Sequence, residues 1–141
     1  IRDLVRSRGL GDVYKRQLLI STTGRASVPG IRSVLNEDIL VFTSTELGDT
    51  TSGSWAMYFD GSDIGLRTEI DGLAVGSNGD IYISTSVTTT IDALVIEDED
   101  AFICRPISLG LSTSCYIPPE LYFDGSVWNL SDDGLDGIVV P

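Results

Sequence analysis

The feature that most constrains the fold is an internal repeat with a period of about 63 residues. Five short segments recur in one order with offsets of 62 to 65 residues: LLISTTG (18–24) with IYISTSV (81–87), EDILVF (37–42) with EDAFIC (99–104), LG (47–48) with LG (109–110), MYFDGS (57–62) with LYFDGS (121–126), and IDGL (70–73) with LDGI (135–138). Five matches in the same order indicate two tandem copies that bury apolar surface against each other. Residues 18–80 form the first repeat and residues 81–141 the second, together part of one repeat domain.

Each copy is expected to contain four short strands. In the first copy these are residues 39–43, 54–59, 71–76 and 80–86. Asn78-Gly79 predicts a hairpin turn between the last two, because both residues tolerate positive φ. Several strands are apolar on both sides, which predicts sheets that are covered on both faces.

Small antiparallel sheets repeated in tandem are typical of a β-propeller. The stretch IDGLAVGSNGDIYISTS (70–86) resembles the inner strands of NHL-type propeller blades, which pair a G-x-A-V strand with a D-G-N-x-Y-V-A hairpin; it departs from that pattern at Asp80 and at Ser84-Thr85. The whole repeat also resembles repeats of secreted bacterial proteins. We therefore expect an all-β fold of two tandem four-stranded antiparallel repeats, a fragment of a β-propeller, with a β-sandwich or a β-solenoid as the alternatives. The period exceeds the roughly 40–50 residues of familiar blades, and the surplus lies in residues 21–38 and 84–100.

Residues 1–17 are basic in an otherwise acidic chain and have a different origin in our interpretation. A DNA sequence that encodes SRGLGDVYKRQ (7–17) resembles the transposase-type adapter of sequencing libraries, and the preceding residues fit the rest of that adapter. The resemblance implies that residues 1–17 are a translated artefact and that the natural chain begins near Leu18 as a fragment. We then expect residues 1–17 not to pack with the rest, and Leu4, Val5 and Tyr14 to lie outside the core. A genuine basic tail is the alternative.

The charge of the remaining chain excludes some partners. Residues 1–17 hold five of the nine basic and two of the 21 acidic residues, so residues 18–141 keep four arginines and 19 carboxylates, a net charge of −15. Such a charge repels nucleic acids and anionic membrane surfaces. No apolar run reaches the roughly 18 residues of a membrane span. The composition fits a secreted or cell-surface protein.

Cys104 and Cys115, the only cysteines, lie on either side of Leu109-Gly110. A hairpin that turns there would place them opposite each other, so we expect a disulfide in a secreted chain. Catalysis is harder to assemble. The chain has no His, and its single Lys lies within residues 1–17, so the commonest general base and the Schiff-base amine are absent from the rest. We predict no catalytic residues and no cofactor.

Three pairs of aspartates, Asp38/Asp100, Asp60/Asp124 and Asp71/Asp136, occupy equivalent positions in the two copies, and the last two pairs offer one candidate site. Asp60 and Asp71, and their counterparts Asp124 and Asp136, each flank one connection between strands. If the flanked strands are neighbours, the two carboxylates of each pair should approach one another and could bind Ca²⁺, which takes oxygen ligands. The alternative is structural, because Asp is common at turns and strand starts.

Two classes of function remain. The first is a non-catalytic extracellular repeat module that binds a glycan, protein or surface ligand or has a structural role. The alternative is part of a propeller-type hydrolase or lactonase whose active residues lie in missing blades.

Overall fold

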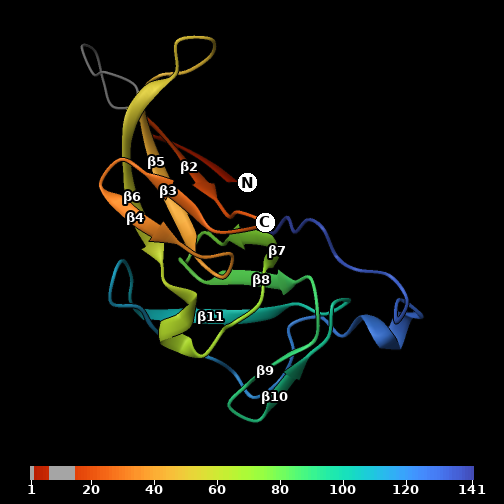
Figure 1. Ribbon diagram of the computed structural model, residues 1–141. Coiled ribbons are helices and arrows are strands. Elements are labelled where there is room, and N and C mark those ends of the chain that lie inside the picture. Colours follow the sequence, from red (N-terminus) through yellow and green to blue (C-terminus); the bar gives the residue numbers. More distant parts are fainter. Residues whose placement is uncertain (1, 7–14) are drawn as a thin grey trace.

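The structure, a computed structural model, describes residues 2–6 and 15–141 as an all-β fold with two short 3-10 helices (Figure 1). The first antiparallel sheet has the strand order β1-β2-β5-β6, with β1 (Arg2–Arg6), β2 (Lys15–Ile20), β5 (Ile39–Glu46) and β6 (Ser52–Phe59). The second has the order β12-β11-β8-β7, with β7 (Ile70–Val75), β8 (Ile81–Thr85), β11 (Phe102–Ser108) and β12 (Ser114–Tyr116). The prediction of small antiparallel sheets is confirmed, and the described sheets do not close into a ring.

A two-stranded hairpin interrupts each four-stranded sheet between its second and third strands in chain order. The hairpins consist of β3 (Ala26–Val28) with β4 (Ile31–Val34), and β9 (Thr89–Ile91) with β10 (Leu94–Ile96). Their turns contain Gly30 (φ 88°) and Asp92 (φ 53°), which are 62 residues apart. Both residue types tolerate the left-handed region. The surplus residues of the long period therefore form an extra hairpin in each copy.

The two copies have the same strand order, β2-β5-β6 in the first and β8-β11-β12 in the second. Their register is also the same, because Ser44 pairs with Gly53 and the residues 62 positions later, Pro106 and Cys115, pair likewise. The expected grouping of strands is wrong in one respect. Residues 39–43 and 54–59 belong to the first sheet, whereas residues 71–76 and 80–86 begin the second. The last strand of the first repeat is thus an edge strand of the second sheet, because the hairpin at Asn78-Gly79 holds β7 against β8.

The segment before Leu18 also departs from expectation. β1 pairs with β2 in antiparallel fashion, from Arg2 opposite Leu19 to Arg6 opposite Lys15. The expectation that residues 1–17 do not pack with the rest is therefore wrong for this backbone pairing. The side chains of Leu4, Val5 and Tyr14 lie outside the described residues. A strand edge presents unpaired N–H and C=O groups that another extended segment can satisfy, and β1 takes the place on β2 that β7 takes on β8.

The main core is shared by both sheets and the β9–β10 hairpin. Its fully buried members include Leu19, Phe59, Ile83, Ile96 and Phe102. Each such side chain contributes about 1.5–3 kcal/mol when removed from water. A second cluster, Val34, Leu40 and Met57, lies on the other face of the first sheet under the β3–β4 hairpin. The first sheet is thus covered on both faces, as its strand pattern predicts.

The repeat predicts burial of five apolar residues, Trp55, Phe59, Leu73, Phe123 and Ile138, but their burial is uneven between the copies. Phe59 and Leu73 are buried, whereas Trp55, Phe123 and Ile138 are only half-buried. The last two belong to the second copy, in which residues 135–138 form no strand although their counterparts begin β7. Pro118-Pro119 also falls between β12 and Phe123. Since proline lacks a backbone N–H, the second copy has no continuous strand like β6.

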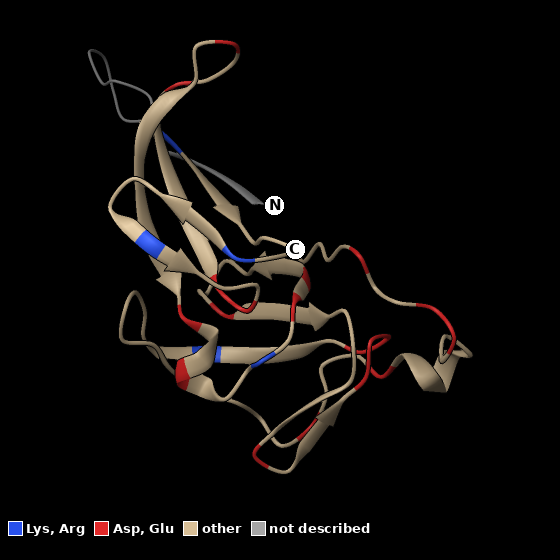
Figure 2. Cartoon of the chain, viewed as in Figure 1, with Lys and Arg blue, Asp and Glu red and all other residues tan. Residues whose placement is uncertain are grey.

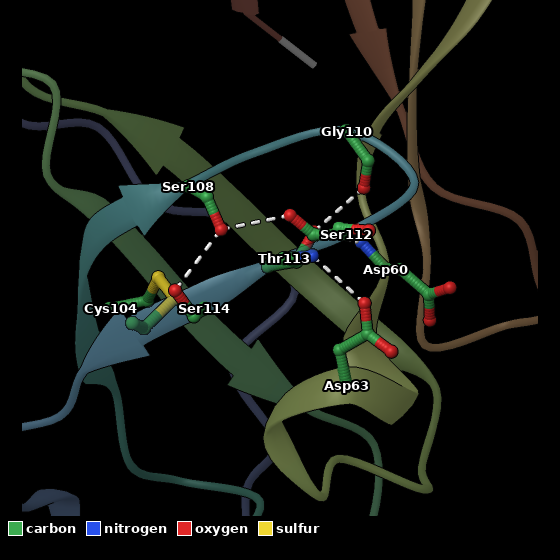
Figure 3. The surroundings of a disulfide bond; sticks show 9 residues. Asp60, Asp63, Cys104, Ser108, Gly110, Ser112, Thr113 and Ser114 are labelled. Atoms are coloured by element: carbon green, nitrogen blue, oxygen red, sulfur yellow. Dashed lines mark hydrogen bonds between the residues drawn. A yellow bond between two sulfur atoms is a disulfide. The ribbon is translucent and has the colours of Figure 1, made fainter.

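The cysteine prediction is confirmed. Cys104 on β11 and Cys115 on β12 form a disulfide with a Cα–Cα distance of 5.3 Å (Figure 3). The equivalent positions in the first copy are Phe42 and Gly53. A Cβ atom on Gly53 would overlap the ring of Phe42 and the carbonyl oxygen of Thr43. The same space is therefore filled by an aromatic ring over a glycine in one copy and by a covalent bond in the other.

Removing the disulfide tests its contribution to the second sheet. We expect the double variant Cys104→Ala/Cys115→Ala to lose about 2–3 kcal/mol of unfolding free energy, because the bond closes an 11-residue separation and restricts the unfolded chain. Urea denaturation of the variant and the parent measures the loss. Two thiols that react after denaturation of the unreduced parent protein would contradict the bond itself.

Candidate functional site

The first pair of recurring acids, Asp38 and Asp100, is buried and fully engaged by backbone donors. Asp38 accepts hydrogen bonds from Leu35 N (2.8 Å, Oδ2) and Gly61 N (3.1 Å, Oδ1). Asp100 accepts the same two bonds from Glu97 N (2.9 Å) and Gly125 N (3.0 Å). Each carboxylate thus joins the turn before the central strand to the glycine of the FDGS motif. These contacts are structural in both copies.

The glycine that follows Asp60 or Asp124 is required by this junction. A Cβ atom on Gly61 would overlap the carbonyl oxygen of Glu37, and one on Gly125 would overlap that of Glu99. The close approach lets the glycine N–H reach the buried carboxylate. The E-D and D-G-S motifs therefore form one interlocking arrangement.

The second pair, Asp60 and Asp124, caps the 3-10 helices η1 (Gly61–Ile64) and η2 (Gly125–Trp128). Asp60 Oδ1 accepts bonds from Ser62 N at 3.1 Å and Ser62 Oγ at 2.6 Å, and Asp124 accepts the same bonds from Ser126 at the same distances. A side-chain oxygen that accepts from the backbone two residues later is the usual role of Asp at a helix start. The structural alternative for these two residues is supported.

Burial raises the pKa of Asp38 above its ordinary value, and the two backbone hydrogen bonds oppose that rise. The negative charges of Asp60 and Glu37 raise the same pKa further. A buried carboxyl is costly unless its oxygens have donors, and the two backbone N–H groups supply them.

The third pair lies at a different place. Asp71 and Asp136, one from each copy, line a cavity of about 310 Å³ together with Ser21, Gly72 and Leu73 and residues 137–139. Residues 135–139 run beside β7, and Ser84 Oγ on the neighbouring strand β8 donates to Leu135 O at 3.0 Å. The equivalent bond in the first copy runs from Ser21 Oγ to Ile70 O at 3.3 Å. Each IDGL-type segment is therefore held by the same serine contact within its own copy.

Electrostatic repulsion is concentrated at this cavity. Burial raises the pKa of Asp71 above its ordinary value, and the charges of Asp136 and Glu69 raise it further. A hydrogen bond with the Asp136 carboxyl acts in the same direction. The loops around this part of the second copy are rich in acidic residues (Figure 2). Burial and neighbouring negative charges therefore both oppose deprotonation of Asp71.

The calcium prediction named Asp60 with Asp71, and Asp124 with Asp136. The side chains of Asp60 and Asp124 accept hydrogen bonds from Ser62 and Ser126, and Asp71 lies beside Asp136. The expected approach within each pair stays a prediction. Among residues 2–6 and 15–141, no group of three or more His, Cys, Asp or Glu side chains is arranged to hold a metal ion.

A smaller cavity of about 230 Å³ lies between residues 91–94 of the β9–β10 hairpin and Ile117-Pro118-Pro119. Its lining offers no residue for acid–base chemistry except Asp92. In the part of the chain that the structure describes, no helix is long and apolar enough to cross a membrane.

Sequence reasoning missed the role of Asp38 and Asp100 and the meeting of Asp71 with Asp136. The signal for the first was present, since the E-D and F-D-G-S motifs recur together in both copies. No signal indicated the second, because it depends on how the copies pack. No family model, no curated protein and no solved structure matches the chain.

Replacing the buried acids tests their structural role. Asp38→Ala and Asp100→Ala should each lower the unfolding free energy by about 2 kcal/mol, because two N–H groups lose their acceptor. Asp49→Ala, on an exposed turn, is the matched control and should change it by less than about 0.5 kcal/mol. Equal effects of Asp38→Ala and Asp49→Ala in urea denaturation would contradict the role.

Replacing Asp71 should have the opposite effect and raise the unfolding free energy at neutral pH. A raised folded-state pKa means that stability from this group is present below the unfolded value of 3.8 and is lost as the pH rises through the folded pKa. Asp71→Asn should therefore increase stability at pH 7 by a few tenths to about 1 kcal/mol and flatten its dependence on pH above 3.8. Thermal melting from pH 3 to pH 8 measures this, with Asp49→Asn as the control. A less stable Asp71→Asn at pH 7 would show that the carboxylate has a stabilising partner such as a cation.

Proposed function

We propose that the chain is a non-catalytic, extracellular repeat module with a binding or structural role at a surface. The observation that carries the proposal is the use of the recurring acids. Asp38 and Asp100 satisfy buried backbone groups, and Asp60 and Asp124 cap short helices. Four of the six recurring carboxylates are thereby engaged in holding the two copies in the same shape.

The proposed architecture is a segment of a β-propeller. Three features support it: sequential strand order within each sheet, repetition of the whole unit, and apolar side chains on both faces of the sheets. A two-sheet sandwich has solvated outer faces. Here the outer face of the first sheet carries Leu40 and Met57 under a hairpin, and Ala74 and Ile103 on the second sheet are also buried. This pattern favours a stack of more than two sheets and disfavours a two-sheet sandwich.

The proposed location is outside the cell or on its surface. The Cys104–Cys115 disulfide is compatible with an oxidising compartment, and the acidic composition fits the same setting. The partner would be a glycan, a protein or another surface ligand, and nucleic acid is disfavoured by charge. We propose that no cofactor is needed, with Ca²⁺ at the recurring aspartates as the alternative.

The second candidate function is part of a propeller-type hydrolase or lactonase. One observation favours it: Asp71 has a raised pKa, lies beside a second carboxyl and lines a cavity. Pairs of carboxyls with shifted pKa values are common at catalytic sites. The remaining residues of such a site would have to come from outside the described chain.

Turnover assays separate the two candidates. The purified chain is incubated with aliphatic lactones, p-nitrophenyl acetate and p-nitrophenyl glycosides. Each assay is run with and without CaCl₂ at about 5 mM, which exceeds the dissociation constants of extracellular calcium modules. We expect no turnover above buffer. Activity that Asp71→Asn abolishes and Asp49→Asn leaves intact would overturn the proposal in favour of the hydrolase. Calorimetric titration with CaCl₂ alone tests the calcium alternative, for which heat of binding lost in Asp136→Asn is the supporting result.

A further inference from the structure

The two copies are joined by a specific contact between a turn and a short helix. The turn Gly110–Thr113, between β11 and β12, packs on the end of β6 and on η1 (Figure 3). Gly110 N donates to Tyr58 O at 2.9 Å, and Asp60 N donates to Thr113 Oγ1 at 2.9 Å. Thr113 N donates to Asp63 Oδ2 at 2.8 Å. We call the turn of the second copy the donor surface, because Gly110 N and Thr113 N donate from it, and residues 58–64 of the first copy the acceptor surface; in the third bond Asp60 N donates back to the turn.

The first copy contains the same turn, which makes no such contact with the other described residues. Gly48 has a φ of 97°, close to the 95° of Gly110, and both threonine hydroxyls, Thr51 Oγ1 and Thr113 Oγ1, donate to the carbonyl of the glycine three residues earlier. Residues 47–51 are all exposed, whereas Thr113 is buried. The turn therefore has its docking shape before anything docks on it, which lowers the cost of binding.

The second copy likewise contains a second acceptor surface, Tyr122 to Trp128. Its cap repeats that of η1 in each bond and distance, since Asp124 replaces Asp60 and Ser126 replaces Ser62. Its apolar side chains are uncovered, because Val127 and Trp128 are each 69 % exposed. In the first copy the side chain of Ile64, which matches Trp128, is half-buried. Exposed apolar groups gathered in this way mark an interaction surface.

One chain thus has an uncovered donor surface in its first copy and an uncovered acceptor surface in its second. We propose that a second copy of this chain occupies them, head to tail, so that the turn Gly48–Thr51 of one molecule docks on residues 122–128 of the next. The established junction between the copies defines the contacts: Gly48 N to the Tyr122 carbonyl, and Asp124 N to Thr51 Oγ1. The third contact is lost, because Val127 stands where the first copy has Asp63. The inference rests on the repeat architecture of the proposed module and gives it a partner.

Charge governs when such an association forms. Each chain carries a net charge of −12, so two copies repel at low ionic strength. At 1 M salt, screening limits the range of that repulsion to about 3 Å. A contact between different surfaces of identical chains is heterologous and continues into rings or open chains unless one surface is blocked.

Sedimentation velocity of the full chain tests the proposal. At 1 M NaCl we expect the mass to rise with concentration above the 15.2 kDa of the monomer, and at 0.05 M NaCl we expect weaker association. Thr51→Ala removes one interchain hydrogen bond and should weaken association about tenfold. Trp128→Ser should weaken it at least as much. Thr50→Ala removes a neighbouring hydroxyl of the same turn and should leave it unchanged.

A mixing experiment identifies the head-to-tail geometry. Thr51→Ala keeps an intact acceptor surface, and Trp128→Ser keeps an intact donor surface. Each variant alone should stay monomeric at a concentration at which their equimolar mixture forms dimers and no larger species. A monomeric parent chain at 1 M NaCl up to about 1 mM, a concentration at which contacts of about −4 kcal/mol are half-formed, would overturn the proposal. Association that neither variant alters would also overturn it. Sedimentation measures mass and the turnover assays measure catalysis. A failure of the association proposal is therefore distinguishable from a failure of the proposed function.

Discussion

The buried carboxylates of Asp38 and Asp100 are the interaction around which each copy is arranged. An unpaired charge in this environment would be strongly unfavourable, so the chain must bring two backbone N–H groups to each of them. One comes from the turn before the central strand and the other from the glycine after the third strand. This requirement fixes the distance between those two turns. It also excludes any side chain at Gly61 and Gly125.

The high acidity of the chain therefore has more than one origin. Some carboxylates accept hydrogen bonds from nearby backbone groups, as in the caps of η1 and η2. Asp71 and Asp136 differ, because their equivalent positions in two copies are stacked against each other and their charges add. Repetition of a single acidic residue thus creates a repulsive pair wherever the copies place that residue on a shared surface.

The units of the sequence and the units of the fold do not coincide. β7 is encoded at the end of the first repeat but belongs to the sheet of the second. The second sheet therefore takes an edge strand from the first copy, and the copies cannot separate without losing it. Within the sheets the copies differ in how they fill equivalent space, as Phe42 over Gly53 and the Cys104–Cys115 bond demonstrate. The backbone arrangement tolerates either, because both join the same two strands.

Local chemistry in the sequence was sufficient for the repeat, the strand-and-turn character, the hairpin at Asn78-Gly79 and the disulfide. Each of these depends on residues that are near in sequence or on a pattern that occurs twice. Tertiary structure alone decided which strands share a sheet, that β1 pairs with β2, and that Asp71 meets Asp136. The physical reason is that a strand edge accepts any extended segment of suitable register, so the choice of partner is made by packing between distant residues. The sequence identified Asp38 as a recurring acid, but only the fold brought Gly61 within reach of its carboxylate.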